Sequence, residues 1–171
     1  MTFTTEPLGK KHDRAAFSCG VAELDQYLKE RASQDAKKRV AAPFVHIDPG
    51  TACIAGYYTL SSFSAELAAL PDETAKKLPR YPLIPATLIG RLAIDEKFRG
   101  KGFGELLLVD ALRRSLDGSR NIASFAVVVD AKDENAESFY EHFGFLRFKS
   151  ASDRLFLPMG TVERLFTDDP Q

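Results

Sequence analysis

The sequence of 171 residues has little that points to a membrane, a disulfide framework or a metal centre. No stretch reaches about 18 apolar residues without a charge, the length needed to cross a bilayer. Residues 1–14 carry positive charges with no apolar run behind them, which argues against a secretory signal. The two cysteines, Cys19 and Cys53, match no metal-binding or redox spacing. We therefore expect a protein of the reducing cytoplasm, without membrane association and without a metal.

The chain also lacks a strong net charge, internal repeats and any linker that would divide it. Its formal net charge is −1 at pH 7, with 44% hydrophobic and 27% charged residues, a composition typical of a globular protein. Its length is sufficient for a core of its own, so we expect one domain over residues 1–171. Basic residues gather at 28–39, where a solvent-exposed helix face is the ordinary explanation.

The first half of the chain predicts a helix followed by a hairpin. Apolar residues recur three and four apart over residues 21–39, which indicates a helix. Strands are expected at 40–47 and 52–63, flanking Asp48-Pro49-Gly50. Proline presets one turn angle and glycine permits a positive φ, so the strands should pair antiparallel. Residues 64–85, with four prolines around a short helix, predict a surface excursion long enough to be functional.

The second half predicts a strand, a helix and a second strand. Residues 86–95 are mostly apolar, as in a central strand. A helix should follow to about Asp117, with Gly118 as its stop, and then a buried strand at 122–130. Further along we expect a helix at 135–142 ended by Gly144, and closing strands at 145–148 and 154–159. The strands at 86–95 and 122–130 are joined through the long helix, so we expect them to form a parallel pair with a right-handed crossover. Together with the antiparallel hairpin this gives a mixed sheet, and the fold class is α/β (α+β).

Three glycines at every second position precede the long helix, namely Gly100, Gly102 and Gly104. A helix N-terminus offers N–H groups without partners and the positive end of a dipole. Glycines ahead of it let the backbone curl around a large anion without obstruction by Cβ atoms. Arg99 and Lys101 add positive charge. The pattern favours a pyrophosphate site.

Two familiar phosphate motifs do not match this segment. A P-loop would have Lys and then Ser or Thr after its last glycine, where this chain has Glu105 and Leu106. A dinucleotide-binding turn would place the third glycine three positions after the second, whereas Gly104 comes two after Gly102. A simple tight turn into a helix explains one glycine but explains three poorly.

The glycine segment resembles the acetyl-CoA signature of the GCN5-related N-acetyltransferase (GNAT) superfamily. That signature is Arg/Gln-x-x-Gly-x-Gly/Ala at the start of a helix after the central strand, and Arg99, Gly102 and Gly104 fill it. The segment ENAESFYEHFGF, residues 134–145, resembles the second half of the signature. The resemblance implies a single GNAT-like domain with a mixed central sheet of about six to seven strands flanked by helices. It also implies an acetyl-CoA-binding core at 86–148.

The resemblance further implies acetyl-CoA as cofactor, coenzyme A as product, and a role for each matching residue. It assigns the pyrophosphate to backbone N–H groups of Arg99, Gly100, Lys101, Gly102, Phe103 and Gly104. It assigns the pantetheine arm and the acetyl carbonyl to main-chain groups of Leu92, Ala93 and Ile94. Asn135 and Ser138 are implied as further cofactor contacts, and Tyr140 as the residue that protonates the departing thiolate.

Acetyl transfer needs a neutral amine, donors for the developing oxyanion and a proton for the leaving sulfur. Strand N–H groups supply the donors. A phenol with a pKa near 10 can donate to a thiolate whose conjugate acid lies near 8.5 only with help from geometry and electrostatics. Outside the motif, Tyr140 would be interpreted as a core aromatic beside Phe139, Phe143 and Phe145.

No residue stands out as a general base. His46 lies in an apolar strand and is expected to be a hydrogen-bonded core residue, while His12 and His142 are expected to be solvated. Asp95 and Glu96, at the end of the central strand, could act through water. A lysine amine near pKa 10.4 is neutral in about one molecule in a few thousand at pH 7, an α-amine near 7.7–8.0 in roughly one in ten. The missing base therefore favours an α-amine or a still less basic amine.

Three further segments resemble one branch of the superfamily, the acetyltransferase toxins of bacterial toxin–antitoxin modules. They are residues 17–28, 56–62 and 88–95. This resemblance implies acetylation of the α-amine of aminoacyl-tRNA, arrest of translation, a small DNA-binding antitoxin as partner, and a homodimer. The net charge of −1 departs from the basic character usual in that branch. Arg91 belongs to this branch-specific region, and its role stays open.

Binding of tRNA requires cations that contact phosphates. The candidates lie in the first predicted helix and in the proline-rich excursion: Lys29, Arg31, Lys37, Lys38, Arg39, Lys76, Lys77 and Arg80. Taken one by one, each of these cations is more typical of a solubilising surface charge than of a phosphate contact. Two other functions remain open at this point: acetylation of a small amine or a protein N-terminus, and acyl-CoA binding without catalysis.

Overall fold

Seven strands form one mixed sheet in this computed structural model, which describes residues 3–149 and 153–167. The strand order is β1-β2-β3-β4-β5-β7-β6, so β4 (Leu83–Ile94) has neighbours on both sides. The expected fold class and the central strand are confirmed. In the described residues, no helix is long and apolar enough to cross a membrane.

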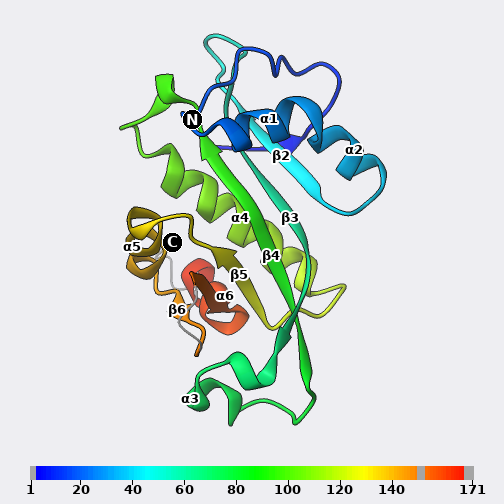
Figure 1. Ribbon diagram of the computed structural model, residues 1–171, viewed down its shortest axis with the longest axis vertical. Coiled ribbons are helices and arrows are strands. Elements are labelled where there is room, and N and C mark those ends of the chain that lie inside the picture. The colour runs from blue at the N-terminus through cyan, green and yellow to red at the C-terminus, as the bar shows by residue number, and fades with distance from the viewer. Residues whose placement is uncertain (1–2, 150–152, 168–171) are drawn as a thin grey trace. The chain divides into compact units, whose positions relative to one another are not determined.

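The chain divides into two compact units, and β3 (Ile54–Glu66), β4 and α4 (Phe103–Ser119) each run through both. The first unit consists of the residues up to Ser61 together with Gly90–Ala111. The second consists of Ser62–Ile89 and the residues from Leu112 onward. Figure 1 labels these elements.

The first unit contains the predicted hairpin. β2 (Ala42–Ile47) pairs antiparallel with β3 from Ala42 opposite Leu60 to Ile47 opposite Ile54. β1 (Glu6–Pro7), which the sequence did not predict, pairs with the outer edge of β2. Gly50 does not use the positive φ that a glycine permits: the left-handed residue of the turn is Ala52, with φ 61°.

The helix expected over residues 21–39 is two helices, α1 (Ala22–Glu30) and α2 (Ala32–Lys37). The break falls at Arg31, whose φ of −120° leaves the helical region. Tyr27, Leu28 and Ala32 are buried on either side of the break, as the periodicity predicted. The bend therefore keeps both helices packed on the core of the first unit, which includes Phe17, Val45 and Tyr57.

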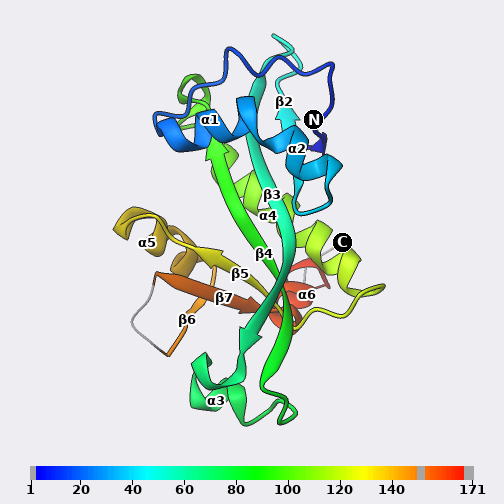
Figure 2. The same cartoon turned by 45° about the vertical axis from the view of Figure 1, so that its right-hand side comes forward.

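The second unit contains the predicted parallel pair. β5 (Ala126–Asp130) pairs in parallel with β4 over Thr87–Ile89 and antiparallel with β7 (Arg154–Pro158), and β6 (Leu146–Arg147) borders β7. Figure 2 shows β5, β7 and β6 side by side. The short helices are α3 (Asp72–Ala75), α5 (Glu134–His142) and α6 (Met159–Thr167), and the 3₁₀ turns are Leu67–Ala69 and, in the first unit, Glu96–Phe98.

Several predicted boundaries in the second unit are wrong. The excursion expected at 64–85 is shorter because β3 continues to Glu66 and β4 begins at Leu83, and Leu70 within it is buried rather than on the surface. α4 continues through Gly118. β5 begins at residue 126, and Ile122, expected in the strand, is 82% exposed. The sequence analysis missed α6, which buries Met159 and Val162.

Candidate functional site

The segment that leads into α4 forms an open cradle of backbone N–H groups in the first unit. Gly100 and Gly102 have φ of +76° and +77°, the left-handed region that favours glycine. A Cβ added at either would meet no atom within 4 Å, so the space in front of the backbone is empty. In the described part of the chain, the N–H groups of residues 100–104 make no hydrogen bond. This geometry fits a large anion.

The charged side chains of this segment do not all point to that anion. The Arg99 guanidinium donates a hydrogen bond to the Cys19 carbonyl, 80 residues earlier in the sequence. The Arg99 N–H bonds to the Glu96 carbonyl, with N and O 3.4 Å apart. Lys101 is exposed, and its Nζ lies 5.4 Å from the centroid of the Phe98 ring. Lys101 is thus available for phosphates, whereas one nitrogen of the Arg99 guanidinium is already bonded to the Cys19 loop.

A loop at residues 18–20 supports the cradle, and the sequence analysis missed it. Asp95 is 2% exposed, and its carboxylate accepts hydrogen bonds from the N–H of Ser18 at 3.0 Å and of Lys97 at 2.9 Å. Gly20 has φ +87°, and a Cβ there would lie 2.7 Å from Oε1 of Glu96. The only signal in the sequence was a glycine directly ahead of the first helix.

The central strand has a free edge beyond its pairing with β5. The ladder between β4 and β5 spans Thr87–Ile89, while β4 continues to Ile94. Gly90 is exposed although it lies in the middle of the strand. Ala93 is buried, and Leu92 and Ile94 are half-buried. Main-chain groups over these residues can therefore pair with an extended ligand in place of a strand.

In the second unit, α5 presents Asn135 and Ser138 on its surface. They are three residues apart, which places them on the same face of the helix, and both are exposed. Asp133 caps the helix, its carboxylate accepting a hydrogen bond from the Ala136 N–H at 2.8 Å. The side chains of Asn135 and Ser138 are therefore available for a ligand.

Tyr140, also on α5, is packed among aromatic rings. Its ring centroid lies 5.3 Å from those of Phe139 and Phe145, and 8% of the residue is exposed. Burial raises the pKa of Tyr140 to about 12. Its hydroxyl has no hydrogen-bond partner among the described residues, and because every fully buried side-chain oxygen there has one, this hydroxyl reaches accessible space. The residue can thus donate a proton to a ligand.

The three histidines considered as general base lie in different environments. His46 is the expected core histidine: it is 8% exposed, its Nδ1 hydrogen-bonds to the Thr4 carbonyl at 2.7 Å, and its ring stacks on Phe3. His142 is exposed. The prediction for His12 is wrong, since 4% of its side chain is exposed. Its Nδ1 accepts from the Gly9 N–H and its Nε2 contacts Glu6.

The two acidic candidates also differ. Both oxygens of Asp95 accept backbone hydrogen bonds, so its carboxylate serves the loop. Glu96 is exposed. In the described residues, no group of three His, Cys, Asp or Glu side chains could hold a metal ion. Among these described candidates, His12, His46 and Asp95 are therefore engaged in hydrogen bonds within the fold, whereas His142 and Glu96 are exposed.

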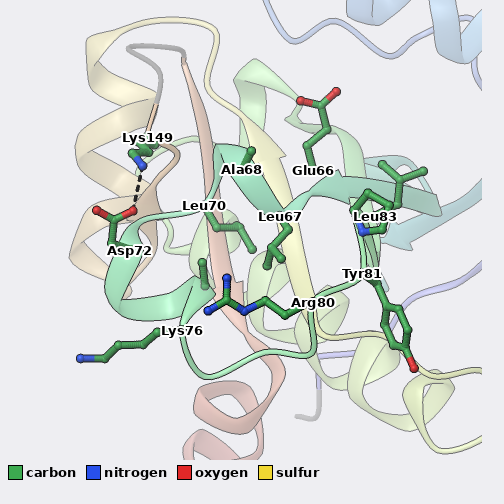
Figure 3. Close-up of a pocket in the computed structure, with 12 residues that line it drawn as sticks. Glu66, Leu67, Ala68, Leu70, Asp72, Lys76, Arg80, Tyr81, Leu83 and Lys149 are labelled. Carbon is green, nitrogen blue, oxygen red and sulfur yellow. Dashed lines mark hydrogen bonds and ion pairs between the residues drawn. The ribbon is translucent and has the colours of Figure 1, made fainter.

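The cations considered for tRNA binding fall into two sets. Five are exposed on and beside α1 and α2: Lys29, Arg31, Lys37, Lys38 and Arg39. In the second unit, Lys76 and Arg80 line a groove of about 720 Å³ together with Lys149, and Figure 3 shows Arg80 extending beside Leu67 and Leu70. Lys149 is paired with Asp72 at 2.7 Å, and Lys76 with Glu73 at 2.8 Å. Arg80 is therefore the cation of this groove best able to contact a phosphate.

Comparison with known proteins gives consistent matches. A family model described as an acetyltransferase (GNAT) domain matches residues 52–147. A probable toxin TacT from Sinorhizobium fredii is 31% identical over 168 residues, covering 94% of this chain and 93% of that protein. A tRNA-acetylating toxin from Mycobacterium tuberculosis is 35% identical over 133 residues, covering 78% of each.

A solved structure extends the likeness to the fold. AtaT complexed with acetyl-methionyl-tRNAfMet superposes with a TM-score of 0.88 at 30% identity, covering 97% of this chain and all of that one.

Proposed function

Because the chain belongs to the acetyltransferase (GNAT) family, we propose that it transfers the acetyl group of acetyl-CoA to the α-amine of an aminoacyl-tRNA and so blocks translation. The observation that carries the proposal is the cradle of five unbonded N–H groups at 100–104, which fits a pyrophosphate. The substrate is argued from the relatives, which include a tRNA-acetylating toxin and a toxin bound to acetylated methionyl-tRNA.

Each residue of the site has a proposed role. The N–H groups of residues 99–104 bind the pyrophosphate. Those of residues 100–104 make the main hydrogen bonds, because they have no other partner in the described residues, whereas the Arg99 N–H is bonded to the Glu96 carbonyl. The main chain of Leu92, Ala93 and Ile94 pairs with the pantetheine arm and the acetyl carbonyl, and Asn135 and Ser138 contact the cofactor from α5. Tyr140 donates the proton that the departing sulfur requires.

The reaction makes one bond and breaks one. The acceptor nitrogen bonds to the acetyl carbon, and the carbon–sulfur bond breaks. The nitrogen loses a proton to water, the sulfur takes one from Tyr140, and the phenol regains one from solvent. An α-amine needs no strong base because a substantial fraction of it is neutral at pH 7.

The proposal treats residues 1–171 as one acetyltransferase domain with its cofactor-binding core at 86–148. It places the protein in the cytoplasm, where aminoacyl-tRNA is found, and includes a small DNA-binding antitoxin and a second copy of the chain as partners.

The test is incubation with labelled acetyl-CoA and a mixture of charged and uncharged tRNA. We expect label on charged tRNA alone. The matched variant Tyr140→Phe should incorporate much less label than the wild-type protein. Label on a simple amine but not on charged tRNA would favour a small-molecule acetyltransferase instead. Heat of coenzyme A binding without transfer to any amine would favour a binding module.

A further inference from the structure

Arg91, the residue of β4 without an assigned role, lies on an aromatic platform in the first unit. Its guanidinium carbon is 3.5 Å from the centroid of the Tyr27 ring. Tyr27 is 4% exposed, and its hydroxyl donates to Asp35 Oδ2 at 2.7 Å. The guanidinium is therefore stacked on a ring that is held at one end by the helix backbone and at the other by the hydrogen bond of its hydroxyl.

The guanidinium retains its hydrogen-bonding capacity. Across residues 3–149 and 153–167, the side chain of Arg91 makes no hydrogen bond and no ion pair. Burial, and to a lesser degree the hydrogen bond to Asp35, raises the pKa of Tyr27 to about 12. The phenol beneath the cation is therefore neutral. Because no fully buried side-chain nitrogen in this part lacks a partner, each guanidinium nitrogen of the half-buried Arg91 keeps some accessible surface. A fixed cation with open donors is prepared for an oxyanion.

A second polar group lies against the preceding residue of the strand. Gly90 precedes Arg91 and is exposed, and a Cβ at Gly90 would lie 3.0 Å from Oγ1 of Thr59. Thr59 is 1% exposed, and its hydroxyl has no partner in the described structure, so its remaining exposure lies at that oxygen. The glycine thus leaves space in the central strand beside the Thr59 hydroxyl, one residue before Arg91.

The position along β4 indicates which molecule supplies the anion. The pyrophosphate cradle is at 100–104 and the proposed pantetheine contacts are at 92–94, so Arg91 lies on the far side of those contacts from the cradle. At about 3.3 Å per residue, Arg91 is roughly 10 Å along the strand from Ile94. The thioester end of acetyl-CoA carries no charged group. An anion bound at Arg91 therefore belongs to the acceptor.

We infer that Arg91 binds a phosphate oxygen of the terminal nucleotide that carries the amino acid in the acceptor. This inference rests on the proposed function. An aminoacyl ester has no free carboxylate, so the phosphodiester next to the esterified ribose is the nearest anion to the reacting amine. Arg91 is thus a positioning residue for the acceptor, and it contributes nothing to cofactor binding.

The test compares Arg91→Gln with Arg113→Gln, a matched control. Arg113 is an exposed arginine of α4 whose guanidinium stacks on Phe166 at 4.3 Å. With methionyl-tRNA, Arg91→Gln should raise KM by about 10-fold to 100-fold, the usual effect of losing a hydrogen bond to a charged group, with kcat within about threefold. The slope of log(kcat/KM) against log salt should fall by about 0.7, as for one lost phosphate contact. Arg91→Lys should restore most of the affinity.

A second acceptor, methionine methyl ester, has the same amine and no phosphate. The rise in KM on this ester should be at least about fivefold smaller than on methionyl-tRNA. Binding of coenzyme A, followed by calorimetry, should not change. If Arg91→Gln does not fold, Arg91→Met, which keeps a long side chain without the charge, carries the same comparison.

Two results would overturn the inference: equal loss on tRNA and ester, or no loss on tRNA, whether or not a carboxylate-bearing acceptor responds to Arg91→Gln. If the wild-type protein acetylates the ester but never methionyl-tRNA, the proposed function fails, and the phosphate contact fails with it.

Discussion

The phenol of Tyr140 shows how burial at a single residue limits the chemistry available to it. A pKa of about 12 makes Tyr140 a weaker acid than free tyrosine, so it stays protonated through the whole physiological range. It is also weaker than the thiol it is proposed to produce. We therefore expect its proton to move late, when negative charge on the departing sulfur is largest.

Tyr140→Phe tests this residue without changing its packing. Loss of general-acid assistance should lower kcat by about 100-fold or more, while the melting temperature and the heat of coenzyme A binding stay the same. With an amino-acid amide as acceptor, the wild-type rate should rise as the amine deprotonates and then stay level to pH 10, because the phenol loses its proton only near pH 12. A fall centred below pH 10 that is absent from the variant would contradict the assignment.

Asp95 tests whether a buried carboxylate is structural or catalytic. Asp95→Asn removes the charge that accepts two backbone hydrogen bonds, so the free energy of unfolding in urea should fall by about 2 kcal/mol. Activity below the unfolding transition should stay within about threefold of wild type. Glu96→Gln, at an exposed neighbour, should change stability by less than about 0.5 kcal/mol. A stable but inactive Asp95→Asn protein would mean that Asp95 is the base.

At the scale of one element, α4 combines a left-handed, glycine-dependent entry with an ordinary helical body. Its entry contains two left-handed glycines, whereas Gly118 near its end has no positive φ and no atom within 4 Å of an added Cβ. The same substitution should therefore have opposite effects at the two ends of the helix.

Gly102→Ala should destabilise the protein by roughly 1–2 kcal/mol, because a side chain disfavours the left-handed region, and should weaken coenzyme A binding at least about tenfold. Gly118→Ala should instead raise stability by about 0.5–1 kcal/mol, because alanine loses less entropy in a helix, with unchanged affinity. Urea unfolding and calorimetry measure the two quantities. Equal affinity losses for both variants would show that the entry is not the anion cradle.

At the scale of the whole molecule, a net charge of −1 means that attraction to nucleic acid comes from local sets of cations rather than from the protein as a whole. The exposed cations of α1 and α2 form one such set, and Arg80 in the groove of the second unit is a candidate for another. Affinity for tRNA should consequently fall steeply with salt.

Expression of the wild-type chain alone should arrest growth if it acetylates charged tRNA in the cell. Tyr140→Phe and Gly102→Ala should relieve the arrest at equal protein levels, whereas Gly118→Ala should not. The measurement is culture growth after induction, with immunoblots to confirm expression. Normal growth with the wild-type chain, together with robust acetylation of a simple amine in vitro, would speak for a small-molecule acetyltransferase.

The local pattern of the chain was sufficient to predict much of the fold and the outline of the site. Helical periodicity identified the buried residues of α1 and α2, and alternating glycines identified the cradle at 100–104, because φ preferences and hydrophobic spacing act over a few residues. Boundaries were less predictable. The body of β5 was apolar enough to be recognised, yet Ile122 is solvent-exposed because the sheet does not extend to it.

Only the tertiary structure decided which polar groups are already bonded and which are left for a ligand. Asp95 is bonded to Ser18, 77 residues away, and Arg99 to Cys19, 80 residues away, whereas Arg91 is stacked on Tyr27 with its donors open. Nothing near these residues in the sequence announces those partners, because a hydrogen bond between distant segments depends on how the chain packs and not on local preference. The sequence determined the chemistry that the chain carries, and packing determined which side chains are left to perform it.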